Sequence, residues 1–522
     1  MRSIPLPRSS PVSELPLRRR LERQVVRAQA RLEAGIGDRW IPTVLTLVLG
    51  AVIIRAGLDK LVSLNTGVDL AAYTQSVWLL GEGKLPQASL FGTGVHLLEL
   101  HWAFIMYPLA ALGLVVPPAE MLIVVQGVAL ALTVIPLWWL ARRVAKLRVG
   151  SATALIAVYA LHPATHRLGT EDFHPEVLAV PALVGMAYFG ASKKWVPYWL
   201  CIAFALACRA DLGLAIALWG FVALGNRERL VGIWTLGVGL VWSLGLLLVV
   251  QPLVGGSGVT SGLFGYDSTA LGDIVLSSVR DPLVLLNNLV ARENVVLVVS
   301  LLAPVIFLPL LSLRYLAPAI PLAVLYLISD VPAEAAFVER SAMLLAFIMI
   351  AATYALNRLG KMGVDRVFLD VRVLSALVAA AALFFISSSP ISPYERPWDW
   401  STRDATDSAV LEAVALLDDG VAVRASPGAL TTLAERDWLF ALDTASEPSA
   451  AQAGFPAFTR AVLIIELETL ERTESERQDF DRSMTDQGFD LIYDEAGVAL
   501  YSRIEASPPV DDDDDGDGND GG

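Results

Sequence analysis

Long apolar runs constrain the fold of this chain more than any other feature of its sequence. The runs recur between residues 41 and 388, and several approach the roughly 20 apolar residues that a helix needs to cross a bilayer. Charged residues make up only 18% of the chain, whereas soluble proteins carry about 25%. The pattern therefore predicts an all-α polytopic membrane protein.

Eleven membrane-spanning helices are predicted from these runs. The run 98–115 is interpreted as a re-entrant or interfacial helix, because the basic loops then lie on one side of the membrane and the acidic loops on the other. If 98–115 crossed, the basic patch from Arg142 to Arg148 would lie outside. The predicted spans are 41–57, 119–141, 149–163, 177–192, 195–207, 212–225, 229–252, 294–311, 315–329, 338–356 and 372–388.

Composition divides the chain into four regions. Because basic loops face the cytoplasm, the N-terminus is expected inside and the region after the last span outside. That outer region is predicted to be a small α/β domain, since two helical segments alternate with short β-like runs, among them 461–465 and 498–501. The regions are a basic cytoplasmic segment (1–38), a transmembrane domain (39–390) with external loops at 58–118, 164–176 and 254–292, the extracytoplasmic α/β domain (398–505) and a disordered acidic tail (506–522).

The stretch from Glu171 to Glu176 concentrates ionisable groups at a predicted membrane boundary. It contains three carboxylates and one imidazole within six residues, Glu171-Asp172-Phe173-His174-Pro175-Glu176. Such groups are costly there unless they face water, a partner or a ligand. The first external loop carries a second polar group, Asp69, Glu99 and His101. We expect the two loops to meet, with Asp69, His101, Asp172, His174 and Glu176 lining one outward-facing cavity.

The order of several short motifs resembles a known family of bacterial membrane proteins. The motifs are Asp-Leu-x-x-Tyr-x-Gln-x-x-Trp from Asp69, Ala-Arg-Arg from Ala141, and Asp-Phe-His-Pro-Glu from Asp172. Members of this family are known only as a domain of unknown function, or "predicted membrane protein". The family in turn looks like the C-type glycosyltransferases, polytopic enzymes that take a sugar from a polyprenyl-phosphate carrier. The resemblance implies a multi-pass protein of the bacterial cytoplasmic membrane, with the bilayer and a polyprenyl-phosphate-linked sugar as partners and no nucleic acid.

The resemblance also implies roles for particular residues. Asp69 stands where the C-type enzymes carry their catalytic base, although an aspartate there is also typical of a helix N-cap, and one residue can do both. The departing phosphate needs positive charge, for which Arg209 and Arg280 are candidates. The residues expected to bind substrate or donor are Glu99, His101, Asp172, His174, Glu176, Arg209 and Asp211.

Asp172, His174 and Glu176 are also candidates for binding a divalent cation, Mg or Mn. The alternative is a hydrogen-bonded loop that braces two helix ends. The second interpretation is favoured, because one loop supplies too few ligands and His101 or Glu99 would have to complete the set.

Two other classes of function compete with glycosyl transfer. In a lipid or solute transporter, the charged turn from Arg209 to Asp211 would form a midplane substrate site in a broken helix. A non-catalytic envelope protein would use the outer α/β domain. The polar residues gather on one side of the predicted membrane and no inverted repeat is visible, which favours a reaction on one face.

Overall fold

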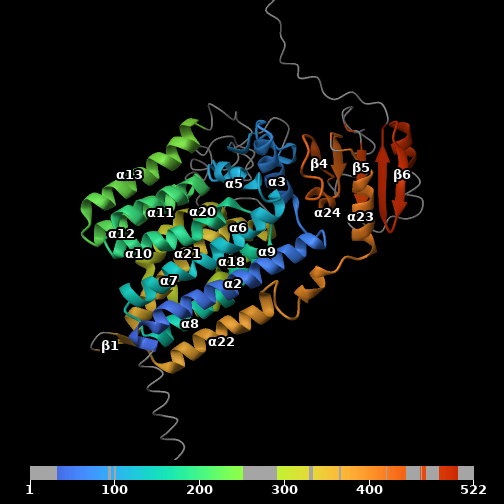
Figure 1. Cartoon of the computed structure of the whole chain (residues 1–522). Coiled ribbons are helices and arrows are strands. Elements are labelled where there is room, and N and C mark those ends of the chain that lie inside the picture. The colour runs from blue at the N-terminus through green and yellow to red at the C-terminus, as the bar shows by residue number, and fades with distance from the viewer. Residues whose placement is uncertain are drawn as a thin grey trace, which may run out of the picture.

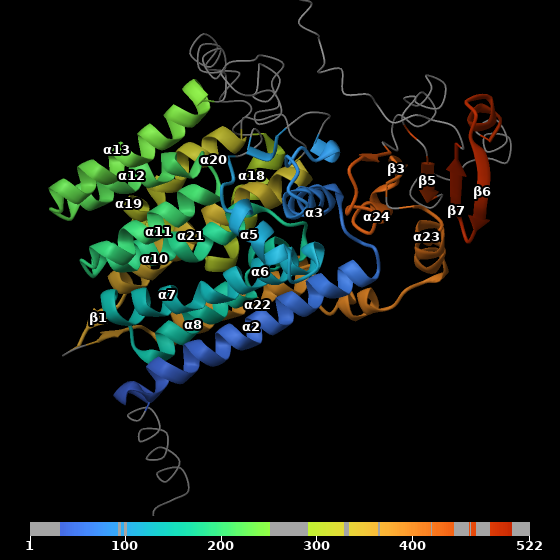
Figure 2. The same cartoon turned by 45° about the horizontal axis from the view of Figure 1, so that its top comes forward.

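A computed structural model of the protein shows a large helical domain with a small β-sheet domain at one end (Figures 1 and 2). The sheet lies at the opposite end of the molecule from the β1–β2 hairpin (Lys361–Met362 and Val367–Phe368). The structure describes residues 32–91, 96–98, 102–250, 291–327, 333–363, 366–418, 420–442, 459, 461–465 and 481–503.

Four helices among the described residues are long and apolar enough to cross a membrane. Helix α2 is the first, and its 26 residues make it about 39 Å long, which exceeds the roughly 30 Å of the hydrocarbon core. The second is the run of α6 (Pro118–Leu132), α7 (Val134–Trp139) and η3 (Leu140–Val144). The four are α2 (Gly37–Val62), Pro118–Val144, Ser341–Leu359 within α21 (Ala333–Leu359), and α22 (Val371–Ser388).

Shorter helices make up the rest of the helical domain. The helix in the range 98–115 is α5 (Met106–Gly113), whose eight residues reach only about 12 Å, less than the thickness of a bilayer. The others of this kind are α3 (Val68–Gly81), α8 (Val149–Leu161), α9 (Pro163–Thr170), η4 (Pro175–Leu178) with α10 (Ala179–Ala191), α11 (Trp195–Cys208), α12 (Leu212–Gly225) and α13 (Arg229–Gly245). The eleven crossings and their direction stay a prediction.

The predicted spans 294–311 and 315–329 need a correction. The structure has helical segments Asn294–Val305 and Leu308–Val324, bent by 84° at a break between them. Ile306 and Phe307 form this break in the left-handed backbone region. The break therefore falls inside the first predicted span, as in a broken span or a re-entrant loop. The elements are α18 (Arg292–Leu302), η6 (Ala303–Val305), η7 (Leu308–Ser312), α19 (Leu313–Leu316), η8 (Ala317–Ala319) and α20 (Ile320–Leu327).

The C-terminal domain, called the outer domain here because it is predicted to lie outside the membrane, is built on a five-stranded mixed sheet of strand order β4-β3-β5-β7-β6. The inner strands β3 and β5 are parallel, and β7 pairs antiparallel with both β5 and β6. The predicted strands at 461–465 and 498–501 are present, while β4 was not predicted. The elements are η9 (Pro397–Ser401), α23 (Ala405–Ala415), β3 (Val423–Ala425), α24 (Pro427–Leu430), β4 (Leu439–Ala441), β5 (Ala461–Ile465), β6 (Asp490–Glu495) and β7 (Val498–Ser502).

The outer domain is docked on the first external loop. Leu64 and Ala71 belong to the same apolar core as Val423 and Leu463 of the sheet. Gln75 of α3 donates from Nε2 to the carbonyl of Arg436 at 3.0 Å. The first external loop and the sheet domain therefore share one core. Two further polar contacts cross the boundary: the Thr66 hydroxyl meets that of Thr431 at 2.8 Å, and Ser89 Oγ bonds both the carbonyl and the N–H of Leu439.

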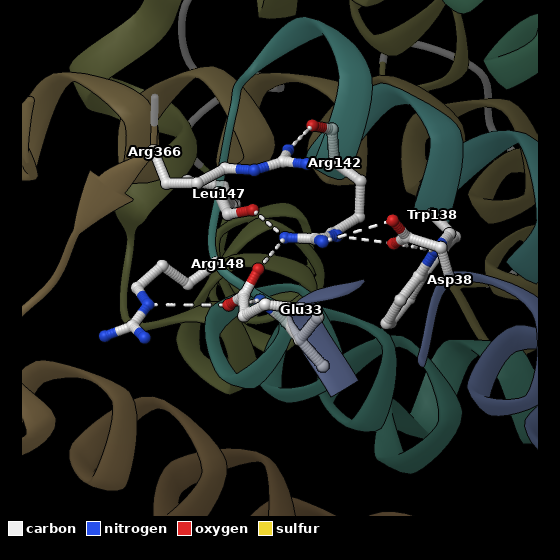
Figure 3. A network of polar contacts seen from close by, with 8 residues as sticks. Glu33, Asp38, Trp138, Arg142, Leu147, Arg148 and Arg366 are labelled. Carbon is white, nitrogen blue, oxygen red and sulfur yellow. Dashed lines mark hydrogen bonds and ion pairs between the residues drawn. The ribbon is translucent and has the colours of Figure 1, made fainter. Parts of the chain in front are cut away.

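A buried arginine ties the start of α2 to η3 at the end of the helical domain away from the sheet (Figure 3). Arg142 is 1% exposed, and its Nε and Nη2 donate to the two oxygens of Asp38 at 2.5 and 3.1 Å. Its Nη1 donates to Glu33 at 3.0 Å and to the carbonyl of Leu147 at 2.7 Å. Glu33 in turn accepts the N–H of Val149, so three segments meet at one guanidinium.

Candidate functional site

The stretch from Asp172 to Glu176 lies against the N-terminus of α3, and Asp172 caps that helix. Its Oδ1 accepts the N–H of Gly67 at 2.8 Å, and its Oδ2 accepts those of Asp69 and Leu70 at 3.0 and 3.3 Å. A carboxylate there satisfies N–H groups that have no partner within the helix and complements the positive end of the helix dipole.

The prediction that Asp69 is the N-cap of this helix is therefore wrong. The N-cap position is Gly67, and the capping side chain comes from Asp172, which is 105 residues away along the chain. A Cβ atom at position 67 would lie 2.5 Å from Oδ2 of Asp172, so only glycine admits the carboxylate this closely. Asp69, two residues on, makes no cap and directs its carboxylate elsewhere.

Asp69 faces His174. Its Oδ2 lies 3.4 Å from Nε2 of His174, and the Asp69 side chain is 45% exposed while that of His174 is only 8% exposed. Nδ1 of His174 lies 2.9 Å from the carbonyl oxygen of Asp172. Because a carbonyl can only accept, Nδ1 is the donor in this contact, and Nε2 is the nitrogen that faces Asp69. A half-buried carboxylate is thus held beside an imidazole whose orientation is fixed.

Gln126 on α6 holds this segment in place, and the sequence analysis missed it. Its Oε1 accepts the N–H of His174 at 2.9 Å, and its Nε2 donates to the carbonyls of Asp172 and Glu171 at 3.2 and 3.3 Å. Gln126 is 2% exposed. The sequence feature that could have identified Gln126 is a single amide inside an apolar span, where a polar side chain is costly unless it has partners.

Glu176, Arg209 and Asp211 form a buried charged triad. Nη1 of Arg209 donates to Oε1 of Glu176 at 2.8 Å, and its Nε donates to Oδ2 of Asp211 at 3.1 Å. All three side chains are at most 5% exposed. Buried charges are tolerated when they are paired in this way. The arrangement favours a brace between η4 and the turn joining α11 to α12 over the predicted donor-binding roles of these residues.

Asp172, His174 and Glu176, the candidate ligands of a divalent cation, each contact a different partner. Asp172 binds backbone N–H groups, His174 faces Asp69, and Glu176 is paired with Arg209. Across the ranges that the structure describes, no three acidic, histidine or cysteine side chains are placed to share a metal ion. Glu99 or His101 would have to complete a set of metal ligands, and both lie outside the described residues, as does Arg280.

The structure thus brings Asp69, Asp172 and His174 together from two loops, as expected. The chemical roles of these residues stay predictions. Glu176, Arg209 and Asp211 form the buried triad beside them. The aromatic ring of Phe173, within the same stretch, packs edge-on against Tyr73 of α3 at 5.4 Å and fixes the two elements against each other.

Comparison with known proteins gives similar solved structures and a family match. No curated protein matches the chain in sequence. Among solved structures, ArnT from Cupriavidus metallidurans bound to undecaprenyl phosphate is similar with a TM-score of 0.49 and 13% identity, over 90% of this chain and 99% of that one. The apo form of that protein gives a TM-score of 0.49 and 12% identity over the same shares. A family profile described as "Predicted membrane protein (DUF2079)" matches residues 60–500, which is most of the chain, and the chain therefore belongs to that family.

Proposed function

We propose that this protein is a membrane glycosyltransferase that transfers a sugar from a polyprenyl-phosphate donor to an envelope acceptor on the outer face of the bacterial cytoplasmic membrane. One observation carries the proposal. The carboxylate of Asp69, in the N-terminal turn of α3, is accessible to solvent and lies 3.4 Å from Nε2 of the buried His174. The motifs at Asp69 and Asp172–Glu176 resemble those of a family that in turn looks like the C-type glycosyltransferases, and this resemblance supports the same assignment.

In this mechanism Asp69 is the general base. It takes the proton of the acceptor hydroxyl while the oxygen forms a bond to the anomeric carbon of the donor sugar. The bond from that carbon to the phosphate oxygen breaks, and the polyprenyl phosphate leaves with the electron pair. His174 holds the carboxylate in position, and its own orientation is set by the carbonyl of Asp172 and by Gln126.

Asp172 contributes by fixing α3. Its capping hydrogen bonds reach the backbone N–H of Asp69 itself, so the base is anchored at its own main chain. A displacement of about 1 Å in such a group can reduce the rate about a hundredfold. Transport is less well supported, because Arg209 is already paired with both Asp211 and Glu176.

The test is a transfer assay with purified full-length protein and radiolabelled polyprenyl-phosphate sugars, with and without EDTA to reveal a requirement for a divalent cation. Asp69→Asn keeps the size and polarity of the side chain but removes its basicity. We expect turnover to fall by about a hundredfold or more at saturating donor, with an unchanged melting temperature.

Glu82→Gln is the matched control, since Glu82 is an exposed acid at the other end of α3. We expect it to keep wild-type turnover. Near-normal turnover in Asp69→Asn would refute the role of Asp69 as the base. Absence of transfer from every polyprenyl-phosphate sugar by the wild-type protein would refute the proposed function.

A further inference from the structure

An open cleft of about 410 Å³ lies where the end of α2 meets the outer domain. One wall is the segment Ser63–Asn65 after α2, and the others are η9, the start of α23 and Gly428 of α24. The cleft thus spans the junction between the two domains. Nothing in the proposed mechanism uses it.

The side chains lining the cleft are those that bind neutral sugars. Asp399, Asp404, Asp407 and Asn65 supply carboxylate and amide groups, and Trp400 supplies an aromatic surface. Carboxylates accept hydrogen bonds from hydroxyls, an amide does both, and the face of an indole covers apolar C–H surface. None of the described residues that line the cleft is basic and three are acidic, which disfavours a phosphate there.

The wall beside α2 is held rigidly. Asn65 N–H donates to the carbonyl of Lys60 at 3.0 Å and Leu64 N–H to that of Leu61 at 3.2 Å, the pattern that ends a helix with a left-handed residue. Here that residue is Leu64, with φ of 50°, where a glycine is usual. Its side chain is buried in the core of the outer domain, which offsets the strain of about 1–2 kcal/mol.

The opposite wall is also preorganised. Asp404 and Asp407 form a capping box at the start of α23, in which each carboxylate accepts the backbone N–H of the other residue at 2.8 and 3.1 Å. Each uses one oxygen for this contact, which leaves its second oxygen for a ligand. Lys60 forms a cation–π contact with Trp400, and its Nζ lies 5.8 Å from the centre of the indole ring.

The cleft is close to the proposed catalytic base. Asn65 precedes Asp69 by four residues, and four residues of chain span at most about 14 Å. A short oligosaccharide bound in the cleft can therefore present a hydroxyl near Asp69. The segment between them is held at Thr66 by Thr431, and at Gly67 and Asp69 by Asp172.

We propose that this cleft is the acceptor site, and that it binds the uncharged sugar units of an envelope saccharide. The proposal rests on the proposed glycosyltransferase function. Trp400 stacks on one sugar ring, and Asp399, Asp404 and Asn65 bind its hydroxyls. Specificity for the acceptor then comes from the boundary between the two domains and not from the membrane helices.

The test measures binding directly, so that it does not depend on turnover. Full-length protein in lipid nanodiscs is applied to an immobilised panel of bacterial envelope oligosaccharides, both uncharged and phosphorylated. We expect saturable binding to uncharged members, at least tenfold weaker in Trp400→Ala. Trp398→Ala is the matched control, because Trp398 lies on the same short helix, is 56% exposed and does not line the cleft. Melting temperatures confirm that both tryptophan variants fold.

Three outcomes overturn the acceptor site: no saturable binding to any uncharged saccharide, equal loss in the two tryptophan variants, or binding of calcium alone at the carboxylates. The two proposals fail separately. If the protein transfers sugar but Trp400→Ala leaves both saccharide binding and the KM for the acceptor unchanged, the cleft is not the acceptor site. If saccharides bind as expected and no polyprenyl-phosphate sugar supports transfer, the saccharide site stands and the transferase function fails.

Discussion

At the scale of single residues, the site depends on a contact that leaves no room for one methyl group. Gly67→Ala places a Cβ 2.5 Å from Oδ2 of Asp172, so the carboxylate must move and its cap on α3 is lost. We expect a loss of about 1–2 kcal/mol in the free energy of unfolding and a fall of about tenfold in turnover. Thermal unfolding in detergent and the transfer assay measure the two effects.

The control for this prediction is Gly150→Ala. Gly150 is an exposed residue near the start of α8, and a Cβ there meets nothing within 4 Å. That variant should unfold and turn over as the wild type does. If Gly67→Ala behaved like Gly150→Ala, the cap formed by Asp172 would not be what holds Asp69 in place.

At the scale of secondary-structure elements, close packing of two glycine-containing helices joins α12 to α13. A Cβ on Gly220 would lie 2.7 Å from the backbone nitrogen of Leu236 and 2.8 Å from the carbonyl of Gly232, so the helices touch at their main chains. Small residues allow such approach in membranes. Gly220→Ala should separate the helices and cost about 1–3 kcal/mol, seen as a lower melting temperature. Gly237→Ala on α13, with open space around it, should be neutral, and equal effects would contradict this account.

A second prediction at this scale concerns the Glu33–Arg142 contact. Burial by itself would raise the pKa of the Glu33 carboxyl, but the N–H of Val149 and the guanidinium groups of Arg142 and Arg148 lower it below its usual value of 4.5. A carboxyl with a lowered folded-state pKa contributes stability above the pKa of the unfolded chain, and this is lost as the pH falls through the folded value.

We therefore expect Glu33→Gln to melt below the wild type at pH 7. The difference in melting temperature between the two proteins should disappear on acidification to about pH 3, because the wild-type carboxyl is then also losing its charge. Thermal unfolding of both proteins in detergent across this range measures the gap, with the exposed Glu82→Gln as a control that shows none. A gap that stayed constant with pH would assign the effect to shape and not to charge.

At the scale of the whole molecule, the orientation in the membrane can be tested on either side of α22. Lys361 and Ser401 are both exposed, and they flank this helix. The predicted orientation places Lys361 in the cytoplasm and Ser401 outside, because basic loops face the cytoplasm. In a background with Cys201 and Cys208 replaced, an impermeant thiol reagent should label Ser401→Cys in intact cells and Lys361→Cys only after permeabilisation. Labelling of Lys361→Cys in intact cells would reverse the topology.

The docking of the outer domain also belongs to this scale. Gln75 and Ser89 were visible in the sequence only as polar residues of the first external loop, and their partners on the outer domain lie more than 300 residues further along the chain. The consequence is that the loop carrying Asp69 shares a core with the sheet. A change in the outer domain is therefore expected to reach the candidate base through this shared core.

The sequence by itself determined the class of the protein and the elements with a local signature. Apolar runs predict membrane helices because the bilayer requires internally bonded backbone. Short apolar runs predicted the strands at 461–465 and 498–501, because a strand buried on both faces is apolar throughout. The grouping of Asp69 with Asp172 and His174 was also accessible, since charged groups at a membrane boundary need partners.

Only the tertiary structure decided which of these groups contact each other. Asp172 and not Asp69 caps α3, and Gln126 forms hydrogen bonds to the loop. Arg209 is paired with Glu176 and Asp211, and the helix is bent near residue 306. Each outcome depends on which donor and acceptor meet between segments far apart in the chain. A hydrogen bond or a buried ion pair is short-ranged and directional, so its partner is fixed by how the helices pack and leaves no periodic signal along the sequence.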